Sequence, residues 1–77
     1  MNSIEEPTRY FARLTEQVGI FEYIVKINDI GCFVTDEVND WEKDEDYKDE
    51  ALSNTHMYVE LSYDEAKECL IIWNREI

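Results

Sequence analysis

The sequence predicts a small α+β domain in which a three-stranded antiparallel sheet is flanked by an N-terminal and a C-terminal helix. Three observations favour this class: the chain has 77 residues, it is 44% hydrophobic with only two Gly and one Pro, and its apolar spacing changes between a helical period and an alternating one. A chain of this length supports one domain at most, so we expect residues 1–77 to share a single small core. The expected order is helix, strand, strand, acidic helix or loop, strand, helix.

A first helix is expected over about residues 4–17. Ser3 and Glu6 have the spacing of a capping box, in which each side chain bonds the backbone N–H of the other residue. Apolar residues then recur at intervals of three and four positions: Phe11, Leu14 and Val18. Both features are typical of the start and the buried stripe of an amphipathic helix.

Residues 20–36 are expected to form a β-hairpin. The apolar period changes to two here, and one side of the first strand carries Phe21, Tyr23, Val25 and Ile27. The sequence Asn-Asp-Ile-Gly at positions 28–31 supplies turn chemistry, and β-branched and aromatic residues continue after it to Thr35. The two runs are therefore predicted to be antiparallel neighbours.

Residues 36–50 differ in composition from the rest of the chain. They contain nine acidic residues and two lysines, and they carry a net charge of −7 out of −12. Asn39 and Glu42 again have capping-box spacing, and acidic side chains in a first turn interact favourably with the helix dipole. This pattern favours a helix over about residues 40–52. An acidic loop is the alternative, since Asp is a poor residue for a helix interior and like charges one turn apart repel.

A third strand is expected over residues 56–61, where the pattern alternates again. The inward side would carry Met57, Val59 and Leu61, and the outward side His56, Tyr58 and Glu60. A closing helix over about residues 63–75 follows, because Ser62 and Glu65 have capping-box spacing. Its apolar stripe consists of Ala66, Cys69, Leu70, Trp73 and Ile77.

One face of this predicted sheet would be left without a helix. If the helices cover the side that carries Tyr23 and Val25, the residues left near solvent are Ile20, Ile24, Tyr58 and Phe33. An exposed apolar patch of this kind marks a contact surface. The apolar run at residues 69–73 is a second candidate contact, since it suits either a dimer or a helix buried on both sides.

The charge balance excludes several classes of function. Nineteen acidic against seven basic residues argue against direct binding to nucleic acid or to an anionic membrane. Glu5 and Glu6 lie where an export signal needs a basic start, and no apolar run is long enough to cross a bilayer. We therefore expect a cytoplasmic protein, located in the host cytoplasm if its source is viral.

Neither catalysis nor a cofactor is expected. Cys32 and Cys69 are interpreted as small buried hydrophobic residues, since a single histidine, His56, does not complete a zinc site without carboxylates. A calcium loop starting at Asp40 fails at its sixth and twelfth positions, which hold neither the required Gly nor the bidentate Glu. Without a Gly-rich loop or a pocket to shift their pKa values apart, the carboxylates are expected to be solvated and not catalytic.

The density of acidic charge is the most informative feature of the sequence. As one helix, residues 36–50 would span roughly 22 Å and carry one net charge per roughly 3.2 Å, close to the phosphate spacing of about 3.4 Å along one DNA strand. Carboxylates would then form a row on one helix face, with Trp41 and Tyr47 as binding anchors. The predicted partner-binding residues are Asp36, Glu37, Asp40, Trp41, Glu42, Asp44, Glu45, Asp46, Tyr47, Asp49 and Glu50.

These features favour a non-enzymatic inhibitor that mimics nucleic acid and blocks the DNA- or RNA-binding cleft of a larger enzyme, so the expected partner is a basic nucleic-acid-binding protein or nuclease complex. In size and acidity the chain is similar to phage-encoded anti-CRISPR and anti-restriction proteins, a similarity of composition that assigns no functional residue. Two alternatives remain: an immunity or antitoxin protein that neutralises a basic nuclease toxin, and an accessory subunit that binds through residues 69–73 or the open sheet face. A monomer and a homodimer both fit these functions.

Overall fold

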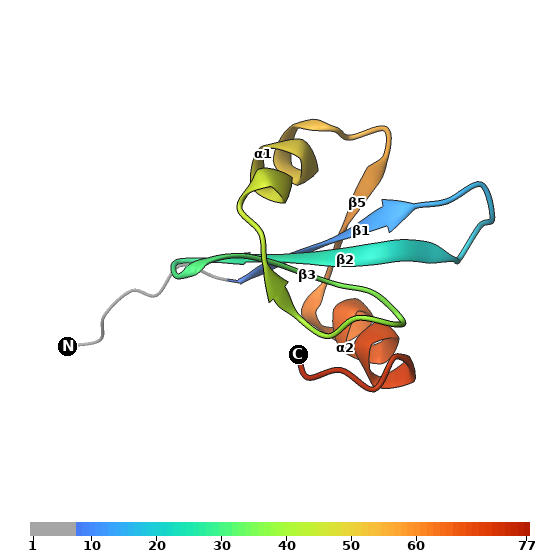
Figure 1. Cartoon of the computed structure of the whole chain (residues 1–77). Helices are drawn as coiled ribbons and strands as arrows, with labels where there is room; N and C mark the ends of the chain where they lie inside the picture. Colours follow the sequence, from blue (N-terminus) through green and yellow to red (C-terminus); the bar gives the residue numbers. More distant parts are fainter. Residues whose placement is uncertain (1–7) are drawn as a thin grey trace.

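A five-stranded antiparallel sheet forms the centre of the computed structural model, which describes residues 8–77 (Figure 1). In chain order the elements are β1 (Arg9–Leu14), β2 (Phe21–Asn28), β3 (Gly31–Thr35), β4 (Glu42–Lys43), α1 (Asp46–Ser53), β5 (Tyr58–Leu61) and α2 (Tyr63–Ile72). The order across the sheet is β4-β3-β2-β1-β5, so the first four strands form a meander and β5 returns to lie beside β1. The α+β class is confirmed, whereas the prediction of three strands is wrong.

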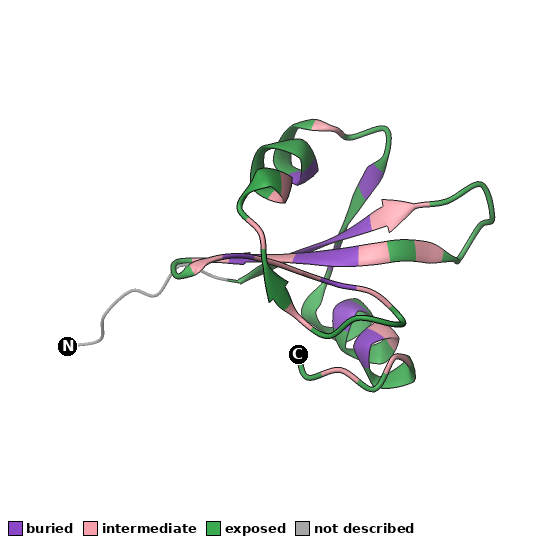
Figure 2. Ribbon diagram, viewed as in Figure 1, coloured by how far each residue is buried: buried purple, intermediate pink, exposed green. Residues whose placement is uncertain are grey.

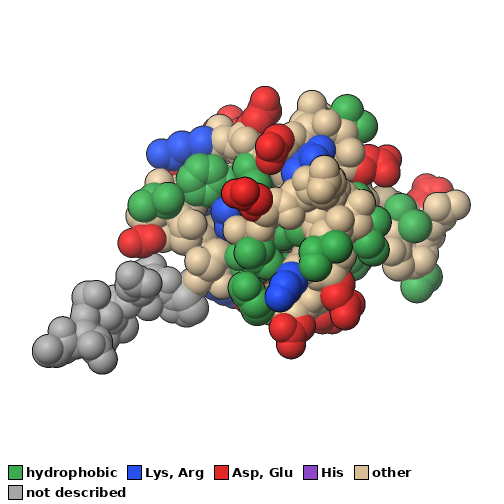
Figure 3. Space-filling model, turned by 90° about the horizontal axis from the view of Figure 1, so that it is seen from below, with side chains coloured by type: hydrophobic (Ala, Val, Ile, Leu, Met, Phe, Trp, Pro, Cys, Tyr) green, Lys and Arg blue, Asp and Glu red, His purple; other side chains and the backbone are tan. Residues whose placement is uncertain are grey.

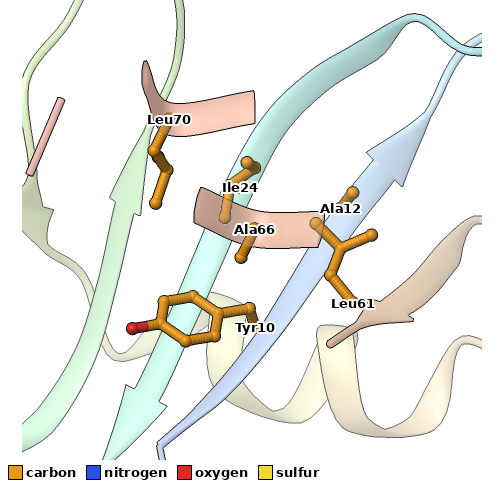
Figure 4. Packing of buried hydrophobic residues seen from close by; sticks show 6 residues of the cluster. All are labelled: Tyr10, Ala12, Ile24, Leu61, Ala66 and Leu70. Atoms are coloured by element: carbon orange, nitrogen blue, oxygen red, sulfur yellow. The ribbon is translucent and has the colours of Figure 1, made fainter. Parts of the chain in front are cut away.

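The two helices lie on opposite faces of the sheet (Figure 1). The hydrophobic cluster between the sheet and α2, called the α2-side cluster, consists of Tyr10, Ala12, Ile24, Leu61, Ala66 and Leu70 (Figure 4). The cluster between the sheet and α1, called the α1-side cluster, consists of Phe11, Val25, Ile27, Cys32, Ala51 and Tyr58. Figure 2 shows buried residues in the strands and on both helices. The expectation of an open sheet face is therefore wrong, because Ile24 and Tyr58 are buried on opposite sides of the sheet.

A strand, β1, stands where the first helix was predicted; residues 4–7 and the Ser3–Glu6 capping box lie outside the described residues. β1 pairs with β2 on one side and with β5 on the other. Tyr10 and Ala12 face the α2-side cluster, and Phe11 between them faces the α1-side cluster. Because both faces are covered, three successive residues are buried, and this continuous run hides the alternation that identifies a half-buried strand.

The β2–β3 hairpin agrees with the prediction for residues 20–36. The side-chain oxygen of Asn28 accepts the backbone N–H groups of Ile30 at 3.0 Å and Gly31 at 3.1 Å, which closes the turn. Gly31 has a φ of 150°, and a Cβ there would lie 2.8 Å from the Cε atom of Lys43. The φ value favours glycine, whereas the nearest atoms, which belong to the Lys43 and Glu45 side chains, lie at the ends of flexible side chains that can move away.

The third predicted strand and the closing helix are both present, with shorter bounds than expected. α2 begins at the predicted capping box, in which Ser62 Oγ accepts the Glu65 N–H at 3.2 Å and Glu65 Oε1 accepts the Ser62 N–H at 2.9 Å. The helix ends at Ile72 and not near residue 75, because Asn74 adopts a left-handed φ of 59°.

The predicted orientation of residues 56–61 is right for Leu61 and Glu60 and wrong for Met57, Tyr58 and Val59. Tyr58 is 4% exposed and Leu61 is 8% exposed, whereas Val59, which was expected to face inward, is 39% exposed. The predicted burial of residues 56–61 assumes a sheet with only one covered face. With a helix on each face, Tyr58 packs toward α1 and Leu61 packs toward α2.

The acidic segment is a loop, a short strand and a short helix, and not one helix over residues 40–52. The Asp36 carboxylate accepts the backbone N–H of Asn39 at 2.6 Å and the side-chain amide of the same residue, so Asn39 closes a turn and does not cap a helix. Glu42 lies in β4, which pairs with β3. The helix begins only at Asp46, since pairing with the sheet fixes an extended backbone before it.

Candidate protein-binding surface

The predicted partner-binding residues lie in the stretch of chain that runs from the end of β3 through the edge strand β4 into α1, which covers one face of the sheet (Figure 1). The predicted row of carboxylates on one helix face is wrong. α1 has eight residues, which corresponds to about 12 Å of helix, and it contains only Asp46, Asp49 and Glu50 of the nine acidic residues. The acidic side chains are instead distributed over a loop, an edge strand and one helix.

Five of the nine acidic residues accept hydrogen bonds inside the fold: Asp36, Asp40, Asp44, Glu45 and Glu50. Glu45 Oε2, for example, accepts the backbone N–H of Cys32 at 2.7 Å and thereby ties the start of α1 to β3. The hydrogen bonds that Asn39 donates lower the pKa of Asp36 below its ordinary value. These carboxylates hold the backbone of the segment in place.

Asp40, Glu45 and Glu50 are exposed although they accept hydrogen bonds, and the other four acidic residues are exposed without such bonds to their carboxylates from the described residues: Glu37, Glu42, Asp46 and Asp49. Within residues 8–77, the ion pairs closer than about 4 Å join Arg9 to Glu60 and Arg13 to both Glu22 and Glu50. Glu50 is therefore the one acidic residue of the segment that has a basic partner in this part of the chain. Almost all of the negative charge of residues 36–50 therefore has no ion pair with a basic side chain in the described part of the chain.

A polar cluster on the α1 side joins Glu50 to the sheet. Tyr58 OH donates a hydrogen bond to Glu50 Oε2, and the Tyr23 and Tyr58 hydroxyl groups bond to each other. Arg13 Nη1 lies 3.9 Å from the same carboxylate oxygen, and the guanidinium lies 5.4 Å from the centre of the Tyr58 ring. Tyr47 packs edge-on against Tyr23, with ring centroids 5.3 Å apart. The cluster connects α1 to β1, β2 and β5.

Burial keeps the tyrosine hydroxyl groups of this cluster protonated. Desolvation raises the pKa of Tyr58, and the hydrogen bond that it donates to Glu50 raises it further. Desolvation also raises the pKa of Tyr23. Tyr23, Tyr58 and Arg13 are absent from the predicted site residues, because no local pattern relates them to Glu50, which follows Tyr23 by 27 positions.

The two predicted anchor residues already have partners inside the fold. Trp41 is half-buried against the α2-side cluster, and its Nε1–H donates to the backbone oxygen of Glu76 at 2.6 Å. The Lys26 ammonium lies 4.3 Å from the centre of the Trp41 ring. Tyr47 is half-buried on the α1 side. The structure therefore places the two anchors on opposite faces of the sheet.

Among residues 8–77, no group of three or more His, Cys, Asp or Glu residues is placed to hold a metal ion. No helix in this range combines the length and apolar character needed to cross a membrane. Cys32 and Cys69 are free thiols on opposite faces of the sheet, and burial raises the pKa of Cys32 to about 11.

Comparison with known proteins gives no relative from which a function can be transferred. No protein-family model, no curated protein and no solved structure matches this chain. The functional argument therefore depends on the position and chemistry of its own residues.

Proposed function

We propose that this protein is a non-enzymatic inhibitor whose acidic surface competes with nucleic acid for a basic cleft on a larger enzyme. The observation that carries the proposal is the uncompensated charge of residues 36–50. Eight of the nine acidic residues there have no Lys or Arg partner within about 4 Å in the described part of the chain, although the segment itself contains two lysines. Such charge costs stability through self-repulsion, and a basic partner would supply the counter-charge that the fold lacks.

The exposed carboxylates lie on three consecutive parts of the segment. Glu37 lies in the loop after β3, Glu42 lies on β4, and Asp46 and Asp49 lie in the first turn of α1. The other acidic residues of the segment fix its backbone through hydrogen bonds. The exposed charges are therefore carried by a preorganised backbone, which reduces the conformational entropy lost on binding.

Inhibition follows from competition for the same cations. A cleft that binds a phosphate backbone presents Lys and Arg side chains, and these side chains pair equally well with carboxylates. Attraction between opposite charges speeds the encounter, and salt weakens it because the Debye length falls from about 10 Å at 0.1 M to about 3 Å at 1 M. The mechanism needs no bond-making step from this protein.

The test compares a neutralised segment with a matched control. The variant carries Glu42→Gln, Asp46→Asn and Asp49→Asn. The control carries Glu16→Gln, Asp29→Asn and Asp64→Asn, which remove the same charge from exposed positions outside the segment. Each protein is immobilised and mixed with nuclease-treated lysate of the natural source or host. Bound proteins are eluted with a salt gradient and identified.

The wild-type protein and the control are expected to capture the same nucleic-acid enzyme and to release it as salt rises. The variant is expected to bind that enzyme at least about tenfold more weakly, and the enzyme's own DNA or RNA substrate should displace the wild-type protein. Equal capture by variant and control would contradict the proposal. A captured enzyme that holds its substrate and this protein together would contradict it as well.

An immunity protein for a basic nuclease toxin is a second candidate that the same uncompensated charge favours. The two functions share their surface chemistry and differ in the partner. The identity of the captured enzyme distinguishes the two functions. A toxin supports the immunity function, and a nucleic-acid enzyme of a defence system supports the anti-CRISPR or anti-restriction function.

A further inference from the structure

An apolar groove lies on the α2 side of the sheet. Its volume is about 520 Å³, and its apolar lining consists of Ile20, Phe21, Leu61, Cys69, Ile72 and Trp73. These residues come from the β1–β2 turn, the start of β2, the end of β5 and α2 with the residue that follows it. Ile20 is 53% exposed and Ile72 is 80% exposed, while Leu61 is 8% exposed. The groove is therefore open to solvent and apolar at its base.

Carboxylates also line the groove. Figure 3 views this side of the molecule and shows hydrophobic side chains gathered on it with acidic side chains beside them. The acidic lining residues are Glu37, Glu65 and Glu68, and within residues 8–77 none of them has a Lys or Arg partner closer than about 4 Å. Glu65 accepts the backbone N–H of Ser62, which lowers the pKa of Glu65 and keeps it charged. No basic residue of the described chain lines the groove.

We propose that this groove binds a basic amphipathic segment of a partner protein. Apolar side chains of that segment enter between Ile20 and Ile72, and its Lys or Arg side chains face Glu37, Glu65 and Glu68. The volume lies within the range of about 300–1,000 Å³ that is typical of small-molecule pockets, which gives room for a few apolar side chains of such a segment. Ion pairs beside an apolar surface are stronger than in bulk water, because fewer water molecules screen them.

Charge argues against the other occupants of the groove. A second copy of this chain would bring a net charge of −12 toward three carboxylates that lack basic partners. A neutral apolar ligand would fill the groove and leave those carboxylates unpaired. A basic amphipathic segment satisfies both the apolar lining and the acidic rim.

Synthetic peptides test this proposal without a known natural partner. Two peptides of roughly 14 residues contain only Leu and Lys, one with Leu at helical spacing and one with Leu at every second position. A third peptide has Ser in place of every Leu and therefore the same charge. Each peptide is titrated into isotope-labelled protein, and NMR follows the backbone amide signals.

Ile72 and Ile71 provide a matched pair of variants. Both lie on α2 and are exposed, at 80% and 63%, but of the two only Ile72 lines the groove. Ile72→Lys and Ile71→Lys change the net charge equally, so the general attraction between the protein and a basic peptide changes equally in both. We expect at least one Leu-containing peptide to shift the signals of groove residues. Its affinity should fall roughly tenfold for Ile72→Lys and less than about threefold for Ile71→Lys.

Three results would overturn the proposal. The first is that neither Leu-containing peptide shifts the signals of groove residues. The second is that the Ser-containing peptide binds as tightly, and the third is that the two Lys variants lose affinity equally. These measurements involve no nucleic-acid enzyme and no change at Glu42, Asp46 or Asp49, so they can fail while the inhibitor function holds, and the reverse is also true.

Discussion

Replacing Tyr58 with Phe tests whether its hydroxyl group holds α1 on the sheet. The Tyr58→Phe substitution keeps the buried ring and removes the hydrogen bonds to Glu50 and Tyr23. A hydrogen bond to a charged group contributes about 1.5–3 kcal/mol. The Glu50 side chain is 48% exposed, so water can replace part of the lost interaction. We therefore expect the free energy of unfolding to fall by about 1–2 kcal/mol, near the lower end of that range.

Urea unfolding followed by tryptophan fluorescence measures this difference, since Trp41 and Trp73 both pack against the α2-side cluster. For a domain of this size, 1 kcal/mol shifts the Tm by about 4–8 °C, so we expect a decrease in Tm of roughly 5–15 °C. Tyr10→Phe is the matched control. Tyr10 is also buried, at 6% exposed, but its hydroxyl group has no hydrogen-bond partner within the described chain.

A double-mutant cycle with Glu50→Ala separates this contact from the general effect of removing a hydroxyl group. Tyr58→Phe removes the donor and Glu50→Ala removes the acceptor of the same hydrogen bond, so the two substitutions should be non-additive by about 1 kcal/mol. The reasoning is refuted if Tyr58→Phe costs no more than Tyr10→Phe, or if the two effects in the cycle simply add.

The helix cap, the turn glycine and a buried thiol give the remaining predictions. Ser62→Ala should lower the free energy of unfolding by about 1 kcal/mol, because the Glu65 N–H loses its acceptor; an unchanged urea midpoint would contradict this role. Gly31→Ala should cost about 1–3 kcal/mol in the same assay, since Gly31 has a φ of 150°, which residues other than glycine rarely adopt. An unchanged urea midpoint would count against this backbone requirement. Burial raises the pKa of Cys32 from 9.0 to about 11, so its contribution to stability is complete below pH 9 and is lost as the pH rises toward 11. Urea midpoints between pH 8 and 11 should therefore fall less in Cys32→Ala than in wild type, and parallel curves would exclude this contribution.

The elements that the sequence predicts well are those specified by neighbouring residues. The β2–β3 turn depends on Asn28, whose side chain bonds the backbone two and three positions later. The start of α2 depends on Ser62 and Glu65, which lie three positions apart. Such interactions form wherever the local sequence occurs, so a pattern search identifies them.

The elements that the sequence predicts poorly are those specified by distant partners. β1 is a strand because β2 and β5 pair with both of its edges, although its apolar spacing also suits a helix. In the acidic segment, Glu50 bonds Tyr58 whereas Asp49 next to it is free of the sheet. The amino-acid composition does not distinguish these two carboxylates. Only the tertiary structure shows that Glu50 bonds the sheet, whereas Asp49 is available to a partner.

The pairing of β1 with β5 has a consequence for the order of folding. Tyr10 lies opposite Leu61, so this pairing closes a loop of about 50 residues, whereas the four strands of the meander pair with their neighbours in sequence. Long-range pairing costs chain entropy before its contacts form, so the meander should assemble first and β5 last. Residues 36–50 lie within the loop, and their mutual repulsion opposes its closure. We therefore expect the charge that we propose for partner binding to slow folding, and we expect the salt that would weaken binding to accelerate refolding.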